Sequence, residues 1–106
     1  MSPLDYHVLL ALASGPLYGY AIKEAVAADS AGRQTPRAGT LYRVIARLIT
    51  AGLVRETRPG GKPEPHPGLE RRYYGRTATG VRVLAGETER LKAAAALAHR
   101  RLGHIR

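Results

Sequence analysis

Apolar residues recur at helical spacing along most of the chain, and residues 35–52 give the clearest case. One side of the helix predicted there is apolar, and the opposite side is polar. The polar side carries positive charge but no carboxylate, which sets this helix apart from an ordinary amphipathic one. The apolar side consists of Leu41, Val44, Ile45, Leu48 and Ile49, and the polar side of Thr40, Arg43, Arg47 and Thr50.

Three further helices are predicted from apolar spacing and from residues typical of helix ends. The first begins at an N-cap serine followed by proline, and Gly15-Pro16 ends it. The second runs from about residue 18 to 29, and a turn at 30–34 follows it. Thr35-Pro36 repeats the cap-plus-proline pattern and is predicted to open the third helix. A last helix starts after a capping threonine at 77 and runs to about 104.

Between the third and last helices the apolar period changes to that of strands. Residues 53–58 and 70–77 are rich in Val, Thr and Tyr, and the segment between them holds four prolines and three glycines. These features predict a β-hairpin with a long exposed loop. The predicted fold is therefore mainly α with a small β-hairpin: a winged helix-turn-helix domain at 1–77, with its wing at 53–77, followed by a long C-terminal dimerisation helix at 78–106.

The formal net charge is +9, and most of it lies in the middle of the chain. Residues 33–76 contain ten Lys or Arg against three Glu. Such a segment favours a polyanionic partner, with nucleic acid first and an anionic membrane second. A charge excess that only aids solubility is the alternative. The position of the arginines on the predicted third helix favours nucleic acid.

Other composition signals predict a cytoplasmic protein without catalytic chemistry. Cysteine is absent, the N-terminus lacks the basic start of a signal peptide, and its apolar run is too short to span a bilayer. The four histidines form no ligand cluster, and no acid–base pair, nucleophile motif or phosphate-binding loop is present. We therefore expect no enzyme activity, no cofactor and no bound metal.

Three segments resemble the PadR family of bacterial transcriptional regulators: "LYGYAIKEAV" at 17–26, "GTLYRVIARLITAGLV" at 39–54 and "RRYYGRTATGVRVL" at 71–84. The resemblance covers nearly the whole chain and implies a homodimeric repressor of the short type, with a single helix after the wing. Some relatives sense phenolic acids or drugs, but no residues here mark a pocket for an effector. One departure is Ala38, where the family usually has proline; the proline here is Pro36, which predicts an earlier helix start.

Candidate DNA contacts concentrate in the first two turns of the third helix, because arginine and threonine there can reach base edges and phosphates. Arg47 lies one turn further along and is predicted to touch the DNA backbone. Tyr42 is either half-buried against the wing or bonded to a phosphate. Tyr18 either packs in the core or bonds a phosphate. Side chains alternate between the two faces of the second predicted strand, and the sequence leaves open which face meets DNA. The full set is Tyr18, Arg37, Gly39, Thr40, Tyr42, Arg43, Arg47, Lys62, Arg71 and Arg72.

The last helix carries a heptad pattern, with steps of three and four residues, that predicts a dimer interface. Its middle is weak, so we expect the first helix to pack against the partner's last helix as well. The alternative is a last helix folded back on its own domain. The heptad seam consists of Val81, Leu84, Thr88, Leu91, Ala95, Ala98, Leu102 and Ile105.

Together these features predict a dimeric, sequence-specific transcriptional regulator, most simply a repressor, that binds an inverted repeat in double-stranded DNA. The alternative is a winged-helix module for protein or non-specific nucleic-acid binding. The arginine-bearing face separates the two only in part, since phosphate binding alone explains its charge.

Overall fold

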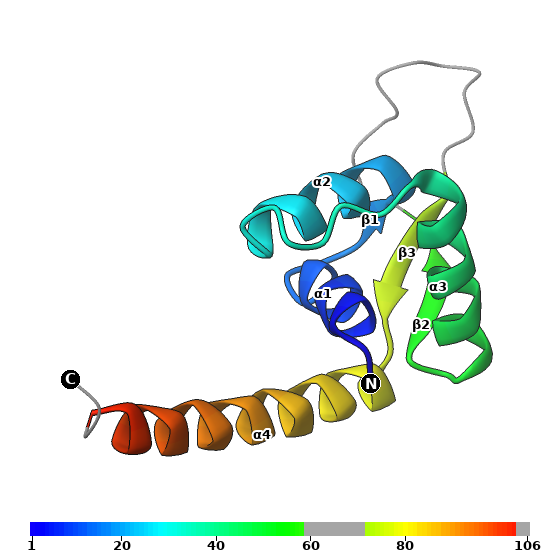
Figure 1. The fold of residues 1–106 in the computed structure, drawn as a ribbon. Coiled ribbons are helices and arrows are strands. Elements are labelled where there is room, and N and C mark those ends of the chain that lie inside the picture. The colour runs from blue at the N-terminus through cyan, green and yellow to red at the C-terminus, as the bar shows by residue number, and fades with distance from the viewer. Residues whose placement is uncertain (59–71, 104–106) are drawn as a thin grey trace.

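Four helices and three short strands make up the described part of the chain, which is residues 1–58 and 72–103 of a computed structural model (Figure 1). The winged helix-turn-helix expected from the sequence is confirmed, with a long helix after the wing. In chain order the elements are α1 (Pro3–Ala11), β1 (Leu17–Tyr18), α2 (Gly19–Asp29), α3 (Ala38–Thr50), β2 (Val54–Thr57), β3 (Tyr73–Arg76) and α4 (Ala78–Leu102).

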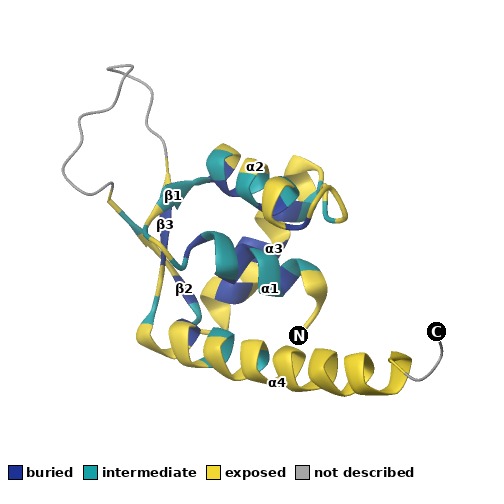
Figure 2. Cartoon of the chain, turned by 90° about the vertical axis from the view of Figure 1, so that its left-hand side faces the viewer, coloured by how far each residue is buried: buried dark blue, intermediate teal, exposed yellow. Residues whose placement is uncertain are grey.

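The hydrophobic core lies where α1, α2, α3 and the sheet meet. α1 lies between α2 and α4 (Figure 1), and the buried positions lie on α1, α2, α3 and the sheet, whereas α4 is mostly exposed (Figure 2). Leucine, isoleucine and valine fill most of this core, since the chain has no Phe or Trp. Its members are Val8, Leu9, Leu12, Ile22, Val26, Leu41, Val44, Ile45, Leu48, Val54 and Tyr74.

The sheet has three antiparallel strands in the order β1-β3-β2, one more than the predicted hairpin. The added strand is β1, in which Leu17 pairs with Tyr74 and Tyr18 pairs with Tyr73. Two residues are too few for a period-2 pattern, so the sequence alone could not identify this strand. Its consequence is that the start of α2 is attached directly to the wing.

The caps at the first and last helices form as predicted. The Ser2 hydroxyl accepts a hydrogen bond from the Asp5 amide, and Asp5 accepts one from the Ser2 amide, which completes a capping box. Thr77 caps α4 by accepting from the Gly80 amide. Gly52 closes α3 with φ +78°, as expected for a glycine after a helix. α1 ends at Ala11, several residues before the predicted Gly15-Pro16 stop.

The predicted start of α3 at Thr35-Pro36 is wrong. The N-cap is Arg37, which is extended with ψ 157°, and the first helical residue is Ala38. The amide of Gln34 donates to the buried Ser30 hydroxyl at 2.9 Å, which ties down the chain before the helix. This hydrogen bond joins residues four apart in the turn after α2, and the chain remains extended through Arg37, beyond the position where proline predicts the first helical turn.

α4 runs away from the domain after its first turns (Figures 1 and 2). All of its residues from Thr88 to Leu102 are exposed in this chain, so the alternative of a helix folded back on its own domain does not describe this structure. No helix among residues 1–58 and 72–103 is both long and apolar enough to cross a membrane. The predicted wing loop, Lys62, Arg71 and Ile105 lie outside the described residues.

Candidate nucleic-acid interface

The N-terminal end of α3 is open to an anion. Arg37 caps it without a side-chain hydrogen bond, and the first helical bond runs from the Leu41 amide to the Arg37 carbonyl at 2.9 Å. The amides of residues 38–40 precede that bond and have no partner within the helix. Amides at a helix N-terminus favour phosphate, both through hydrogen bonds and through the helix dipole.

The polar face of α3 continues from this open end. Arg37 and Arg43 are exposed, and the Arg43 guanidinium reaches Thr40 Oγ1 at 3.4 Å. A Cβ atom added at Gly39 would meet nothing within 4 Å, so the backbone is bare there. Among the described residues no carboxylate pairs with Arg37 or Arg43. Both cations therefore stand beside free amides on one accessible surface.

Tyr42 ties α3 to the start of α2. Its hydroxyl fills the space in which a Gly19 side chain would lie, since a Cβ atom there would be 2.2 Å from the Tyr42 oxygen. Gly19 is buried, whereas Tyr42 keeps 47% of its surface exposed. The tyrosine therefore packs against the start of α2, and nearly half of its surface remains accessible. Sequence reasoning did not identify this role of Gly19. Its helical φ and ψ values do not require glycine, so the backbone conformation gives no signal for it.

Two residues near this contact were not selected from the sequence. Tyr20 and Lys23 on α2 line a hollow of about 100 Å³ together with Ala38 and Tyr42 on α3. A hydrogen bond to Glu24, together with that carboxylate's charge, raises the pKa of the Tyr20 phenol above its ordinary value. Both side chains extend the polar surface of α3 onto α2. Their helical spacing is the only signal that the sequence offered.

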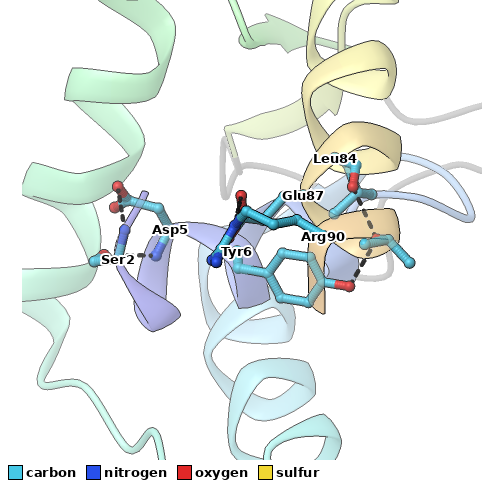
Figure 3. A network of polar contacts seen from close by, with 7 residues as sticks. Ser2, Asp5, Tyr6, Leu84, Glu87 and Arg90 are labelled. Atoms are coloured by element: carbon cyan, nitrogen blue, oxygen red, sulfur yellow. Dashed lines mark hydrogen bonds and ion pairs between the residues drawn. The ribbon is translucent and has the colours of Figure 1, made fainter. Parts of the chain in front are cut away.

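Arg47 is placed differently from the other arginines of α3. Its guanidinium contacts the Asp5 carboxylate of α1 at 2.5 and 3.4 Å. Asp5 is buried and belongs to the capping box of α1, which Figure 3 shows beside Ser2. The carboxylate that the polar face of α3 lacks is thus supplied by another helix, 42 residues away in sequence.

The wing residues divide between the two faces of the sheet. Tyr74 points into the core, while Tyr18 and Tyr73 meet edge to face with ring centroids 5.7 Å apart. Arg72 is exposed and lies 3.9 Å from Glu56, a loose pair that leaves its charge in solvent. Arg72 is therefore accessible beside the wing, and Tyr18 is half-buried within the sheet.

The predicted heptad seam of α4 starts inside its own domain. Leu84 packs against the core, and the Thr88 hydroxyl donates to the Leu84 carbonyl at 2.8 Å while accepting from Tyr6 of α1 at 2.7 Å (Figure 3). Leu91 and Leu102, further along, are exposed by 40% and 60%. Val81 is exposed as well, and so are Ala95 and Ala98. Among the described residues of the seam, then, Leu84 alone is partly buried within one chain.

A hollow of about 280 Å³ separates the N-terminus of α1 from α4. It is lined by Tyr6 and His7 on one side and by Glu87, Arg90 and Leu91 on the other. Hydrogen bonds from Arg90 hold the pKa of Glu87 below its usual range, so this wall carries an ion pair (Figure 3). His7 Nδ1 is buried without a hydrogen-bond partner among the described atoms. No group of three potential metal ligands occurs in the described ranges.

Comparison with known families matches the chain to the model described as the transcriptional regulator PadR-like family, over residues 8–86. Among curated proteins, it is 47% identical over 58 residues to an uncharacterized 37.1 kDa protein in a transposon of Streptomyces fradiae. That alignment covers 55% of this chain but 16% of the relative, so the chain spans about a sixth of that protein's length.

Solved structures share the fold. A transcriptional regulator from Clostridium thermocellum aligns with a TM-score of 0.72 at 22% identity, covering 92% of this chain and 87% of that one. A PadR family regulator from Eggerthella lenta gives 0.68 at 28% identity, covering 94% and 84%. Bacillus subtilis PadR in complex with operator DNA gives 0.64 at 25% identity, covering 82% of this chain and 47% of that one.

Proposed function

The chain belongs to the transcriptional regulator PadR-like family, and from this premise we propose that it is a homodimeric repressor that binds a specific inverted repeat in double-stranded DNA. One observation carries the proposal. The open N-terminus of α3 stands beside Arg37 and Arg43, which no described carboxylate neutralises. The B. subtilis structure with operator DNA supports the same class of partner.

The residues of α3 divide into base readers and backbone contacts. Arg43 and Thr40 lie side by side in the first two turns, where side chains of a recognition helix reach base edges. Arg37 and the bare backbone at Gly39 suit a phosphate that approaches the free amides. Tyr42, with 47% of its surface exposed, adds a hydroxyl-bearing side chain to the same end of α3. On the wing, Lys62, Arg71 and Arg72 provide cations for the flanking phosphates, with Tyr18 at the base of the sheet.

Residues 78–106 serve as the dimerisation element, and residues 1–77 as the DNA-binding domain. The exposed leucines at 91 and 102 support this division, because α4 projects from the domain with its apolar seam uncovered. A second copy would bury that seam and bring two recognition helices into a two-fold arrangement. Thr88 of the seam hydrogen-bonds Tyr6 of α1, so α1 lies beside the seam and would contribute to the interface as well.

Release from DNA by a small molecule is part of the same proposal. The hollow between α1 and α4 supports it, because its wall combines apolar surface with an ion pair and an unpartnered His7 nitrogen. A ligand held there would bias the angle between α4 and the domain. A thermal-shift screen of small aromatic acids against wild type and His7→Ala tests this point, and a stabilising ligand should lose its effect in the variant.

Footprinting on the DNA upstream of the protein's own gene tests the proposal as a whole. A two-fold dimer should protect two inverted half-sites with centres roughly 34–36 Å apart, or a multiple of that spacing. Protection of a single asymmetric half-site over one turn would contradict the dimeric part of the proposal.

A further inference from the structure

Arg47 and Asp5 form the one described ion pair that joins two different helices of the domain. Asp5 has 10% of its side chain exposed and accepts two hydrogen bonds from Arg47, at 2.5 and 3.4 Å. The same carboxylate accepts from the Ser2 amide at 3.4 Å. The first turn of α1 therefore holds the Asp5 carboxylate in place independently of Arg47 (Figure 3).

In the described part of the chain, the Arg47–Asp5 ion pair is one of two polar contacts through which α1 connects α3 to α4. Tyr6 follows Asp5 in the chain and hydrogen-bonds Thr88 of α4 at 2.7 Å. Successive residues of α1 thus hold α3 on one side and α4 on the other. A two-pronged arginine–carboxylate contact fixes orientation as well as distance, because both partners are planar.

We propose that Arg47 is a positioning residue instead of the DNA-backbone contact that its place on α3 predicts. Its guanidinium sets the rotation of α3 against α1, and α1 passes that orientation to α4. In a dimer this contact fixes the angle at which each recognition helix meets its half-site. The inference rests on the proposed function, since it assumes that α3 enters DNA.

The two roles for Arg47 predict opposite effects when Asp5 loses its charge. An arginine that binds phosphate would be freed by Asp5→Asn, so DNA affinity would rise and depend more steeply on salt. An arginine that positions α3 would lose its charged, two-pronged partner, because an amide offers a single neutral acceptor. Affinity for the specific site would then fall, and affinity for random DNA would change little.

The experiment compares Asp5→Asn with Asp29→Asn, which removes the same charge from an exposed position at the end of α2. Affinity for the upstream DNA and for random DNA is measured over a range of salt concentrations. We expect Asp5→Asn to weaken specific binding by about tenfold, in the range of couplings between linked elements, with an unchanged salt slope. Asp29→Asn should bind both DNAs as well as wild type or slightly better.

Arg47→Lys is the second variant to be tested in the same DNA titrations. If Asp5→Asn does not fold, the result for Arg47→Lys decides between the two roles of Arg47. Lysine keeps the charge that a phosphate contact needs but cannot form the two-pronged contact with Asp5. A loss similar to that of Asp5→Asn is expected. Near-wild-type binding by Arg47→Lys, or Asp5→Asn binding no weaker than Asp29→Asn, would overturn the inference. Wild-type protein that does not distinguish the two DNAs would instead refute the proposed function.

Discussion

Gly80, in the first turn of α4, lies directly against the carbonyl oxygen of Leu53: a Cβ atom added there would be 2.1 Å from that oxygen. The same oxygen accepts a hydrogen bond from the Thr77 amide at 3.2 Å, and the Thr77 hydroxyl donates to the Gly52 carbonyl at 2.6 Å. These contacts determine where α4 leaves the sheet. The carbonyl oxygens of Gly52 and Leu53 are backbone atoms, which cannot move aside as a flexible side chain can.

The first prediction contrasts two glycines of the same helix. Gly80→Ala should lower the free energy of unfolding by about 2–3 kcal/mol, because the new methyl overlaps a backbone carbonyl. Gly86→Ala adds a methyl to open space and should raise the free energy of unfolding by up to about 1 kcal/mol. Urea unfolding followed by circular dichroism gives both values. Equal effects in the two variants would mean that α4 does not start in this position.

The second prediction separates stability from binding at Gly39. Alanine there has room for its methyl and favours the helix, so Gly39→Ala should gain about 0.5–1 kcal/mol in stability. The same methyl would stand where the bare backbone approaches a phosphate, so operator affinity should fall. The unfolding curve and a DNA titration are measured on one preparation. A stabilised variant with unchanged affinity would exclude close phosphate approach at this residue.

The third prediction assigns base reading to Arg43. Arg43→Ala should cost about 1–3 kcal/mol on the specific site and much less on random DNA. Lys62→Ala, by contrast, should weaken both DNAs alike and lower the salt slope by about one phosphate contact. Fluorescence anisotropy at several salt concentrations distinguishes the two patterns. If Arg43→Ala weakened both DNAs equally, the arginine would be a phosphate contact.

The fourth prediction concerns the exposed seam of α4. Leu91→Asp would bring two carboxylates together in a buried interface, where desolvation and repulsion both oppose ionisation. The dimer should dissociate at micromolar concentration. Operator affinity should then fall by orders of magnitude, because the effective concentration that joins the two half-site contacts, of order millimolar, is lost. Sedimentation and a DNA titration on the same sample measure both effects.

Leu97→Asp is the matched control for the seam. Leu97 is similarly exposed, but it lies six residues further along, about 120° around the helix from Leu91. The same charge there should leave dimerisation and DNA binding unchanged. A Leu91→Asp protein that remained dimeric would show that the interface is built elsewhere.

Helix periodicity and caps were sufficient to predict most of the fold. The Ser2 and Thr77 caps form as expected, since a capping residue acts on amides two or three positions away in its own segment. The predicted start of α3 is wrong because the chain after the Ser30–Gln34 turn stays extended through Arg37, which the Thr35-Pro36 pattern does not reveal. β1 was missed because its pairing partners lie more than fifty residues away.

The candidate site was predictable in composition but not in geometry. The polar face of α3 could be read from spacing, and the structure keeps Thr40 and Arg43 together on it. The contact of Arg47 with Asp5 could not be read from spacing, because its partner lies on another helix. The close contact at Gly80 could not be predicted either, because the Leu53 carbonyl that leaves no room for a side chain there belongs to a segment 27 residues earlier.

The most direct test of sequence-specific binding through α3 is a competition titration of the wild-type protein at about physiological salt. Labelled DNA from upstream of its own gene is displaced by the same unlabelled DNA or by random DNA of equal length. We expect the upstream DNA to bind at least about 10³-fold more tightly, as specific regulators do. Equal affinity for the two DNAs would contradict sequence-specific binding, because the polar face of α3 would then bind phosphates without reading bases.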